Sequence, residues 1–251
     1  MLIPITTVLC LIPLFIIVSI AYGMTGMGGT STFLALMTLF DVPRDIIVPT
    51  ALFMGLSVAA FTTFNYSRHG HVRIELLAPG LIASIPAAYL GGKLELSQFK
   101  FQIIVIIVLL LVVFQMLFLK PHEKTKAPSK IICCFALLVL GALLGFAAGT
   151  IGIGGGILLG PVLLLFGWVN IHEAAAISAP FTAVNCLTGL LSKIADHSIN
   201  WPVILIFAVP AVITGFIASH WAAKRGKAIV IQRVFGVVIF IAVVDMIINL
   251  F

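Results

Sequence analysis

Ten apolar segments follow one another along the chain, separated by short polar connections. They occupy residues 2–22, 29–40, 46–66, 74–92, 99–119, 131–148, 156–167, 174–192, 201–221 and 229–250. Eight are long enough, or nearly so, to cross the hydrocarbon layer of about 30 Å as an α-helix. Segments 29–40 and 156–167 reach only about 18 Å as helices. Each of these two is either a thin tilted span or the returning arm of a re-entrant hairpin.

The amino-acid composition indicates that these segments lie in a lipid bilayer. Of 251 residues, 62% are hydrophobic and only 9% are charged, whereas a soluble domain carries about 25% charged residues. The segments are too long for strands and lack alternation, which excludes a membrane barrel. The sequence therefore predicts an all-α polytopic membrane protein with eight to ten transmembrane or re-entrant helices.

Two glycine-rich stretches precede the two short segments. The first is Gly23-Met24-Thr25-Gly26-Met27-Gly28-Gly29-Thr30, and the second is Gly149-Thr150-Ile151-Gly152-Ile153-Gly154-Gly155-Gly156. Four glycines of the first stretch match four of the second at a constant offset of 126 residues. We interpret them as two copies of one device, each breaking a helix near the membrane midplane.

The matching extends over the whole chain and indicates an internal repeat. Residues 1–120 form the first predicted repeat, residues 121–130 a cytoplasmic linker, and residues 131–251 the second repeat. Ala51, Phe53 and His69 match Ala179, Phe181 and His197 at offset 128. Five segments per half is an odd number, so the second half enters the membrane from the opposite side, as in many transporters.

Charge placement agrees with an inverted repeat. If the connections of ten segments alternate sides, one side collects Arg68, Arg73, Lys120, Lys124, Lys126, Lys130, Lys224, Arg225, Lys227 and Arg233. The other side collects Arg44, Lys93, Lys100 and Lys193. The excess of basic residues makes the first side cytoplasmic and places both termini outside the cytoplasm. An eight-span scheme divides the same residues about evenly.

The glycine stretches have the chemistry of an anion site. A helix that begins after such a stretch presents N–H groups without helical acceptors and a partial positive charge. The candidate binding residues are Thr25, Gly26, Gly28, Gly29 and Thr30 in the first copy and Gly152, Gly154, Gly155 and Gly156 in the second. The alternative is that these small residues only let helices approach closely. No Gly-Lys-Ser/Thr triplet follows either stretch, so neither is a nucleotide loop.

The long segment after each short one is the candidate lining of this site. Ser178, Thr182 and Asn185 are spaced four and three residues apart, so they share one helix face. Ser57 aligns with Asn185 at offset 128. Alternatively, such side chains bond to their own backbone or to a neighbouring helix. Lys193, at the outer end of the same segment, either attracts anions or extends to the interface.

Other chemistry is absent from the sequence pattern. The six histidines lie in connections or at segment ends, and no nucleophile–base pair is visible. The cysteines Cys10, Cys133, Cys134 and Cys186 lie within apolar segments without metal-ligand spacing. We therefore expect no enzyme activity, no metal, no cofactor and no disulfide. The cations lie in short connections without interleaved aromatics, so nucleic acid is not an expected partner.

Several of these motifs together resemble the TauE/SafE family of sulfite exporters and anion permeases. They are the paired glycine stretches, the run Glu173-Ala174-Ala175-Ala176-Ile177-Ser178, and the pairs Pro86–Gly91 and Pro210–Gly215. The resemblance covers essentially the whole chain and implies a permease for sulfite or organosulfonates in the bacterial cytoplasmic membrane, often acting in export. In the first half, Asp45-Ile46-Ile47-Val48-Pro49-Thr50 replaces the alanine-rich run.

The expected function is secondary transport of a small sulfur-containing anion by alternating access. A passive anion channel on the same scaffold is the alternative, since the sequence does not separate the two. The expected partners are the anion and the lipid bilayer. A coupling ion, proton or sodium, and a homodimeric state stay open.

Overall fold

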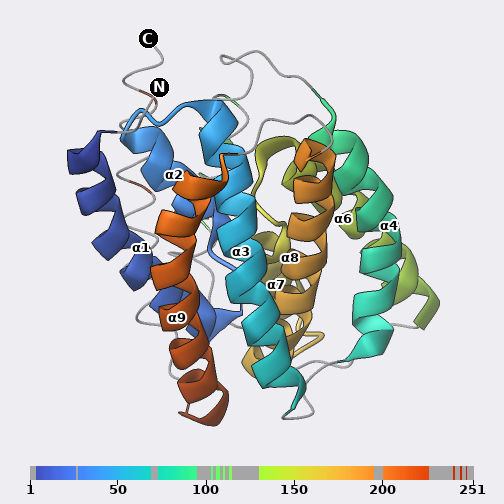
Figure 1. Ribbon diagram of the computed structural model, residues 1–251. Coiled ribbons are helices and arrows are strands. Elements are labelled where there is room, and N and C mark those ends of the chain that lie inside the picture. Colours follow the sequence, from blue (N-terminus) through green and yellow to red (C-terminus); the bar gives the residue numbers. More distant parts are fainter. Residues whose placement is uncertain are drawn as a thin grey trace.

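The computed structural model describes residues 4–26, 28–68, 73–94, 130–194 and 200–225, together with isolated residues between 103 and 114 and between 240 and 247. Eight α-helices make up these ranges, and no strand occurs in them (Figure 1). They are α1 (Ile5–Thr25), α2 (Thr30–Leu39), α3 (Arg44–Ser67), α4 (Ile74–Gly92), α6 (Lys130–Ile151), α7 (Gly156–Leu165), α8 (Ile171–Ile194) and α9 (Trp201–Arg225). The predicted segments 99–119 and 229–250 lie outside the described ranges.

Six of these helices are long and apolar enough to cross a membrane, which confirms a multi-pass membrane protein. Their apolar spans are Ile5–Met24, Asp45–Ser67, Ile74–Gly92, Ile131–Ile151, His172–Ser192 and Trp201–Trp221. Each coincides with a predicted long segment and begins or ends within a few residues of it. The agreement follows from physics, because a backbone in lipid must satisfy its hydrogen bonds within its own helix.

The two short helices each cover about half of the membrane depth. Helices α2 and α7 have 10 residues, or about 15 Å. The methyl group of Thr30, the first residue of α2, lies against Gly55, half-way along α3. Gly156, the first residue of α7, lies against Thr182, half-way along α8. Each short helix therefore begins near the middle of the long helix that follows it and runs toward that helix's first turn.

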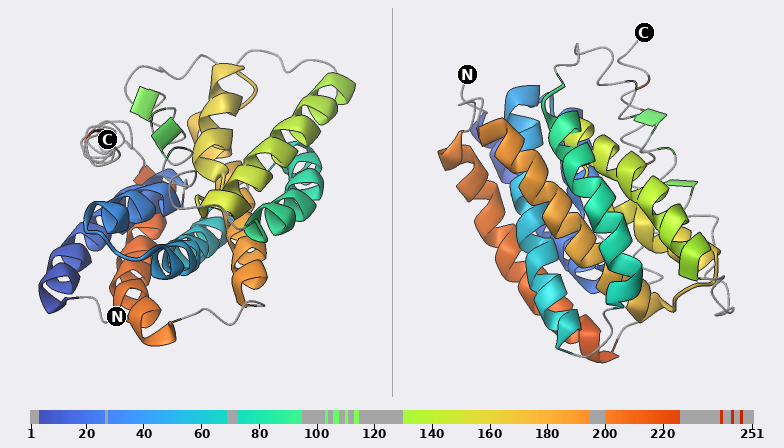
Figure 2. Two further views of the ribbon diagram at one scale, coloured as in Figure 1. Left: turned by 90° about the horizontal axis from the view of Figure 1, so that it is seen from above. Right: turned by 90° about the vertical axis from the view of Figure 1, so that its right-hand side faces the viewer.

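The helices pack as two bundles that lie side by side and touch through α3 and α8 (Figure 2). The first bundle contains α1, α2, α3 and α9, and the second bundle contains α4, α6, α7 and α8. Helix α3 packs against α8 and joins the two bundles. Each bundle thus takes three helices from one half of the sequence and its fourth helix from the other half.

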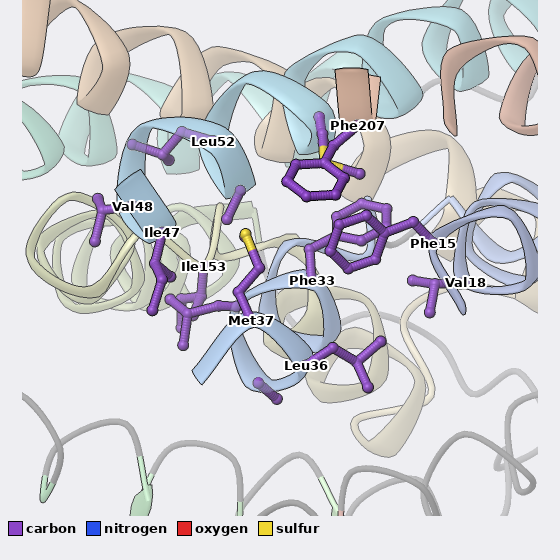
Figure 3. Close-up of a cluster of buried hydrophobic side chains, with 14 of the residues drawn as sticks. Phe15, Val18, Phe33, Leu36, Met37, Ile47, Val48, Leu52, Ile153 and Phe207 are labelled. Atoms are coloured by element: carbon purple, nitrogen blue, oxygen red, sulfur yellow. The ribbon is translucent and has the colours of Figure 1, made fainter. Parts of the chain in front are cut away.

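Aromatic and aliphatic side chains fill the first bundle (Figure 3). The rings of Phe33 and Phe207 both meet the ring of Phe15 edge to face, with centroids 5.4 and 5.2 Å apart. Such pairs stabilise a core beyond simple burial of apolar area. Ile153, from the second glycine stretch, lies in this same cluster beside Met37. The second glycine stretch therefore inserts an apolar side chain into the first bundle.

Small residues set the spacing of α4 and α6. A methyl group on Gly141 would lie 2.8 Å from the Cα atom of Gly80, and one on Gly145 would lie 2.6 Å from the Cα atom of Ser84. Close backbone approach at small residues is typical of helix pairs in membranes, where lipid offers no hydrophobic drive for association.

The first glycine of each glycine stretch belongs to such a helix contact. Gly149 of α6 lies against Ala88 of α4, and Gly23 of α1 lies against Gly215 of α9. The helix-packing alternative therefore applies to Gly23 and Gly149. The later glycines of each stretch have a different geometry.

Candidate functional site

The two glycine stretches form turns with the same backbone conformation. Three glycines in each turn have left-handed φ angles: 73°, 76° and 72° at Gly26, Gly28 and Gly29, and 85°, 71° and 73° at Gly152, Gly154 and Gly155. A residue with a Cβ atom loses roughly 1–2 kcal/mol in this conformation. Three left-handed positions within four residues therefore explain why both stretches use glycine at these places.

The two turns meet at Thr182 of α8. A methyl group on Gly28 would collide with the Thr182 Cγ2 atom, and a methyl group on Gly154 would lie 2.7 Å from the same atom. The hydroxyl of Thr30, which follows the first turn, donates a hydrogen bond to the carbonyl oxygen of Ile153 in the second turn. The structure thus brings Gly28, Thr30, Gly154 and Thr182 together at one place.

Helices α2 and α7 both begin at this meeting point. In α2, the amides of Thr32 and Phe33 bond to the carbonyl of Gly29, at 3.1 and 3.0 Å. In α7, the amides of Leu158 and Leu159 bond to the carbonyl of Gly155, at 3.2 and 3.3 Å. The N–H groups ahead of these have no acceptor within an α-helix and carry the positive end of its dipole. Among them, the Gly156 amide donates to the carbonyl of Gly154 in the turn, at 3.0 Å.

Three buried side-chain oxygens lie along α8, and Thr182 is the residue among them that contacts both glycine turns. Ser178, Thr182 and Asn185 are fully buried. Within the part of the chain that the structure describes, the oxygens Ser178 Oγ, Thr182 Oγ1 and Asn185 Oδ1 have no hydrogen-bond partner. The Thr182 hydroxyl lies against Gly156, at the start of α7, and the Ser178 hydroxyl lies against Gly160.

Burial of these oxygens without hydrogen-bond partners lowers the stability of the folded protein. A buried polar group without a partner costs about 1–3 kcal/mol, and folded proteins contain few of them. Asn185 satisfies only its nitrogen, which donates to the carbonyl of Phe181 at 2.8 Å. Three such groups within eight residues of one helix indicate a place where a ligand supplies the missing partners.

The remaining predicted site residues do not all join this cluster. The Ser57 hydroxyl donates to the carbonyl of Phe53, one turn earlier in its own helix, at 2.8 Å. Thr188 does the same with Val184, at 2.9 Å. The backbone-bonding alternative therefore holds for the Ser57 hydroxyl. The side chains of Thr25 and Lys193 lie outside the described part of the structure.

The structure adds contacts that the sequence pattern did not indicate. Tyr22 and Thr32 share a hydrogen bond of 2.7 Å between their hydroxyls, which ties α1 to α2 across the first turn. The Tyr66 hydroxyl donates to the carbonyl of Met24 at 2.9 Å and holds the last turn of α1. Cys186 is fully buried, with its sulfur 2.8 Å from a methyl group placed on Gly154. No spacing in the sequence links these pairs, because each joins separate helices or the two sides of a turn.

The electrostatics of this site come from dipoles. Among the described residues, every buried polar side chain other than tyrosine and cysteine is a serine, threonine or asparagine. Charged residues stand at the described starts of three helices: Asp45 in α3, Glu75 in α4 and Glu173 in α8. Each lies about half a helix length from the middle of its own helix. The arrangement therefore offers N–H and O–H donors and two helix N-termini to a ligand without a fixed positive side chain.

Comparison with known proteins gives consistent matches. A family model described as "Sulfite exporter TauE/SafE" matches residues 11–246. A protein of Sinorhizobium fredii, named a probable membrane transporter protein, is 31% identical over 184 residues, which cover 72% of this chain and 74% of that protein. A protein of Methanocaldococcus jannaschii with the same description is 22% identical over 252 residues, covering 91% of this chain and 94% of that protein. No solved structure matches the chain significantly.

Proposed function

The chain belongs to the TauE/SafE sulfite exporter family of membrane transporters, and on this premise we propose that it carries sulfite or an organosulfonate out of the cell across the cytoplasmic membrane. The observation that carries the proposal is the meeting of two glycine turns and two helix N-termini at Thr182, on a helix that carries three unpartnered buried oxygens. A small oxyanion has several acceptor oxygens, and these are the partners that the donors of this site lack.

The anion binds through replacement of its hydration shell. The hydroxyls of Ser178 and Thr182 donate to its oxygens. The first amides of α2 and the Ile157 amide of α7 do the same from two directions, since the Gly156 amide already bonds to Gly154. A helix N-terminus is a general anion-binding element because its N–H groups and dipole both favour negative charge. The glycines serve this role by leaving the amides uncovered.

Burial of the site favours a carrier over an open pore. Ser178, Thr182 and Asn185 are each 0% exposed, so solvent reaches the site from neither side in this conformation. A carrier passes through such a closed state, whereas a conducting channel needs a continuous path. We therefore propose alternating access.

The two halves of the sequence are proposed to be inverted repeats. Two observations support this in addition to the charge bias: the φ angles of the turns agree at offset 126, and helix contacts recur when the halves are exchanged. Helix α1 packs on α9 as α6 packs on α4, and α3 packs on α9 as α8 packs on α4. In this scheme residues 1–120 and 131–251 are the repeats, the linker 121–130 is cytoplasmic, and both termini are extracytoplasmic.

The test of the site is Thr182→Val, which keeps the shape of the side chain and removes the hydroxyl. A hydrogen bond to a charged group contributes about 1.5–3 kcal/mol, so the affinity for radiolabelled sulfite should fall about 10- to 100-fold. Saturable uptake into liposomes containing the purified protein measures the change. Trans-stimulation of that uptake would identify a carrier, and a linear voltage-driven current a channel.

The matched control is Thr188→Val on the same helix, because the Thr188 hydroxyl already bonds to its own backbone. This variant should transport with unchanged affinity. Without anion, Thr182→Val should melt at the same or a higher temperature than the native protein, because it loses an unpartnered buried hydroxyl. Equal sulfite affinity of the native protein and Thr182→Val would contradict a binding site between the two turns.

A further inference from the structure

We propose that this site selects anions by charge state: it holds a singly charged oxyanion and rejects the doubly charged form of the same anion. The inference rests on the proposed function and specifies its substrate further. For sulfite, it means that hydrogen sulfite is the bound and transported species. For organosulfonates, it means that the group is accepted at every pH, since a sulfonate carries a single charge throughout.

The first argument is the amount of positive charge available at the site. Each helix N-terminus acts as roughly half of an elementary charge. Helices α2 and α7 both begin beside Thr182, with the Thr30 hydroxyl bonded to Ile153 between them. Together they supply about one positive charge, which one negative charge balances. A dianion would leave about one negative charge unbalanced.

The second argument is that no cationic side chain makes up the difference within the described ranges. The titratable groups that pack around the turns are Tyr22 from α1, Tyr66 from α3 and Cys186 from α8. None of these side chains becomes positively charged in any protonation state. The described residues of α2, α3, α6 and α7 that line the meeting point, Thr30, Gly55, Ile153, Gly154 and Gly156 among them, have no titratable side chain.

The third argument is the cost of dehydration. The energy needed to bring an ion from water into a medium of low dielectric constant rises with the square of its charge, so a dianion costs about four times as much as a monoanion of equal size. The site is fully buried. Its hydroxyl and amide dipoles stabilise an ion in proportion to the charge, so they interact about twice as strongly with the dianion while its desolvation cost is about four times as large. The cost therefore grows faster than the stabilisation, which disfavours the dianion.

The Asn185 Oδ1 atom adds a fourth observation. It is a buried acceptor without a donor in the described structure, and a carbonyl oxygen has no hydrogen to offer an anion. A protonated oxyanion supplies a donor to such an acceptor. A fully deprotonated oxyanion such as a sulfonate lacks this one contact and binds through the donors of the site alone.

The experiment measures equilibrium binding of three anions to the purified full-length protein in detergent, below and above the second ionisation of sulfite. The probes are radiolabelled sulfite kept under anaerobic conditions, methanesulfonate as competitor and sulfate as competitor. The apparent affinity for total sulfite should weaken about tenfold for each pH unit on the alkaline side, because the singly charged fraction falls by that factor. Affinity for methanesulfonate should not change with pH, which controls for titration of the protein itself.

Sulfate, a dianion at both pH values, should not compete. Sulfite affinity that stays constant or rises on the alkaline side, or competition by sulfate, would overturn selection by charge state while leaving the anion site in place. If sulfite and methanesulfonate both fail to bind at either pH, the proposed function fails, and this inference fails with it.

Discussion

Thr182 contacts both glycine turns with the same γ-methyl group, but the surroundings of the two glycines differ. A methyl group on Gly28 would collide with Thr182 Cγ2 alone, since the next atoms, Cβ and Oγ1 of the same residue, are 3.4 and 3.6 Å away. A methyl group on Gly154 would meet Thr182 Cγ2 at 2.7 Å, the Cys186 sulfur at 2.8 Å and Thr30 Oγ1 at 3.1 Å. One γ-methyl group thus fills the space at Gly28, while three residues enclose Gly154.

This difference predicts a selective rescue. Gly28→Ala should destabilise the protein by about 1–2 kcal/mol from its left-handed backbone and about 1–3 kcal/mol more from overpacking. Thr182→Ser removes the γ-methyl group and keeps the hydroxyl, so it should recover the overpacking part in Gly28→Ala. The same substitution should recover little in Gly154→Ala, because Cys186 and Thr30 remain.

Thermal unfolding of the single and double variants in one detergent measures this rescue as a double-mutant cycle. Gly154→Ala serves as the control for a general effect of Thr182→Ser. Equal rescue of both alanine variants would contradict the contact geometry at Thr182.

At the residue scale, the sequence predicts the turns and only part of the lining. The glycines repeat at a fixed offset, and their left-handed conformation is a local property, so their role was predictable. Ser57 and Asn185 are aligned and both polar, yet the Ser57 hydroxyl bonds to its own helix while Asn185 Oδ1 stays without a partner. That difference depends on side-chain rotamers and neighbours, which a single sequence does not encode in any readable pattern.

At the scale of elements, the contact between α4 and α6 depends on residues without bulk. A methyl group on Gly145 would lie 2.5 Å from the carbonyl oxygen and 2.6 Å from the Cα atom of Ser84. Gly145→Val should therefore push the two backbones apart and destabilise the protein by about 1–3 kcal/mol. Leu143→Val, on the same helix at a position that is 64% exposed, should change stability by less than about 0.5 kcal/mol.

Thermal unfolding in lipid nanodiscs distinguishes the two variants. A Gly145→Val protein as stable as Leu143→Val would show that the α4–α6 distance is not set by this glycine.

Segment length predicts the long helices better than the short ones. Six spans were predictable because an apolar run of about 20 residues has one stable solution in lipid. The half-depth helices α2 and α7 were not, because a run of about 12 residues fits both a tilted span and a returning arm. Their depth is set by Thr30 at Gly55 and by Gly156 at Thr182, which are tertiary contacts.

At the scale of the whole molecule, the packing units differ from the repeats in the sequence. A repeat pattern shows which segments are alike, and it does not show which segments touch. Helix α9 leaves the helices of its own half and packs with α1 and α3. If access alternates, we therefore expect the first and second bundles to move against each other at the α3–α8 contact, so that each half of the sequence is divided between both moving units.

Distances between spin labels test which units move. Ile17→Cys on α1 and Ile217→Cys on α9 lie in one bundle but in different halves, and both positions are more than half exposed. Leu143→Cys on α6 lies in the same half as Ile217→Cys but in the other bundle. The exposed cysteines Cys10 and Cys134 are first replaced by alanine.

Addition of sulfite should change the distance distribution of the 143/217 pair and leave that of the 17/217 pair unchanged. The opposite result would mean that the sequence halves, and not the two bundles, are the rigid units of transport.

The uncharged character of the membrane interior, as far as the described residues show it, determines how voltage acts on the cycle. With no fixed charge at the site, the empty protein carries no side-chain charge through the electric field when it reorients. The loaded protein carries the single charge of its anion. In the proposed export cycle, an interior-negative potential of about 100 mV would favour outward passage by about 2.3 kcal/mol, so the membrane potential would act on the loaded step alone.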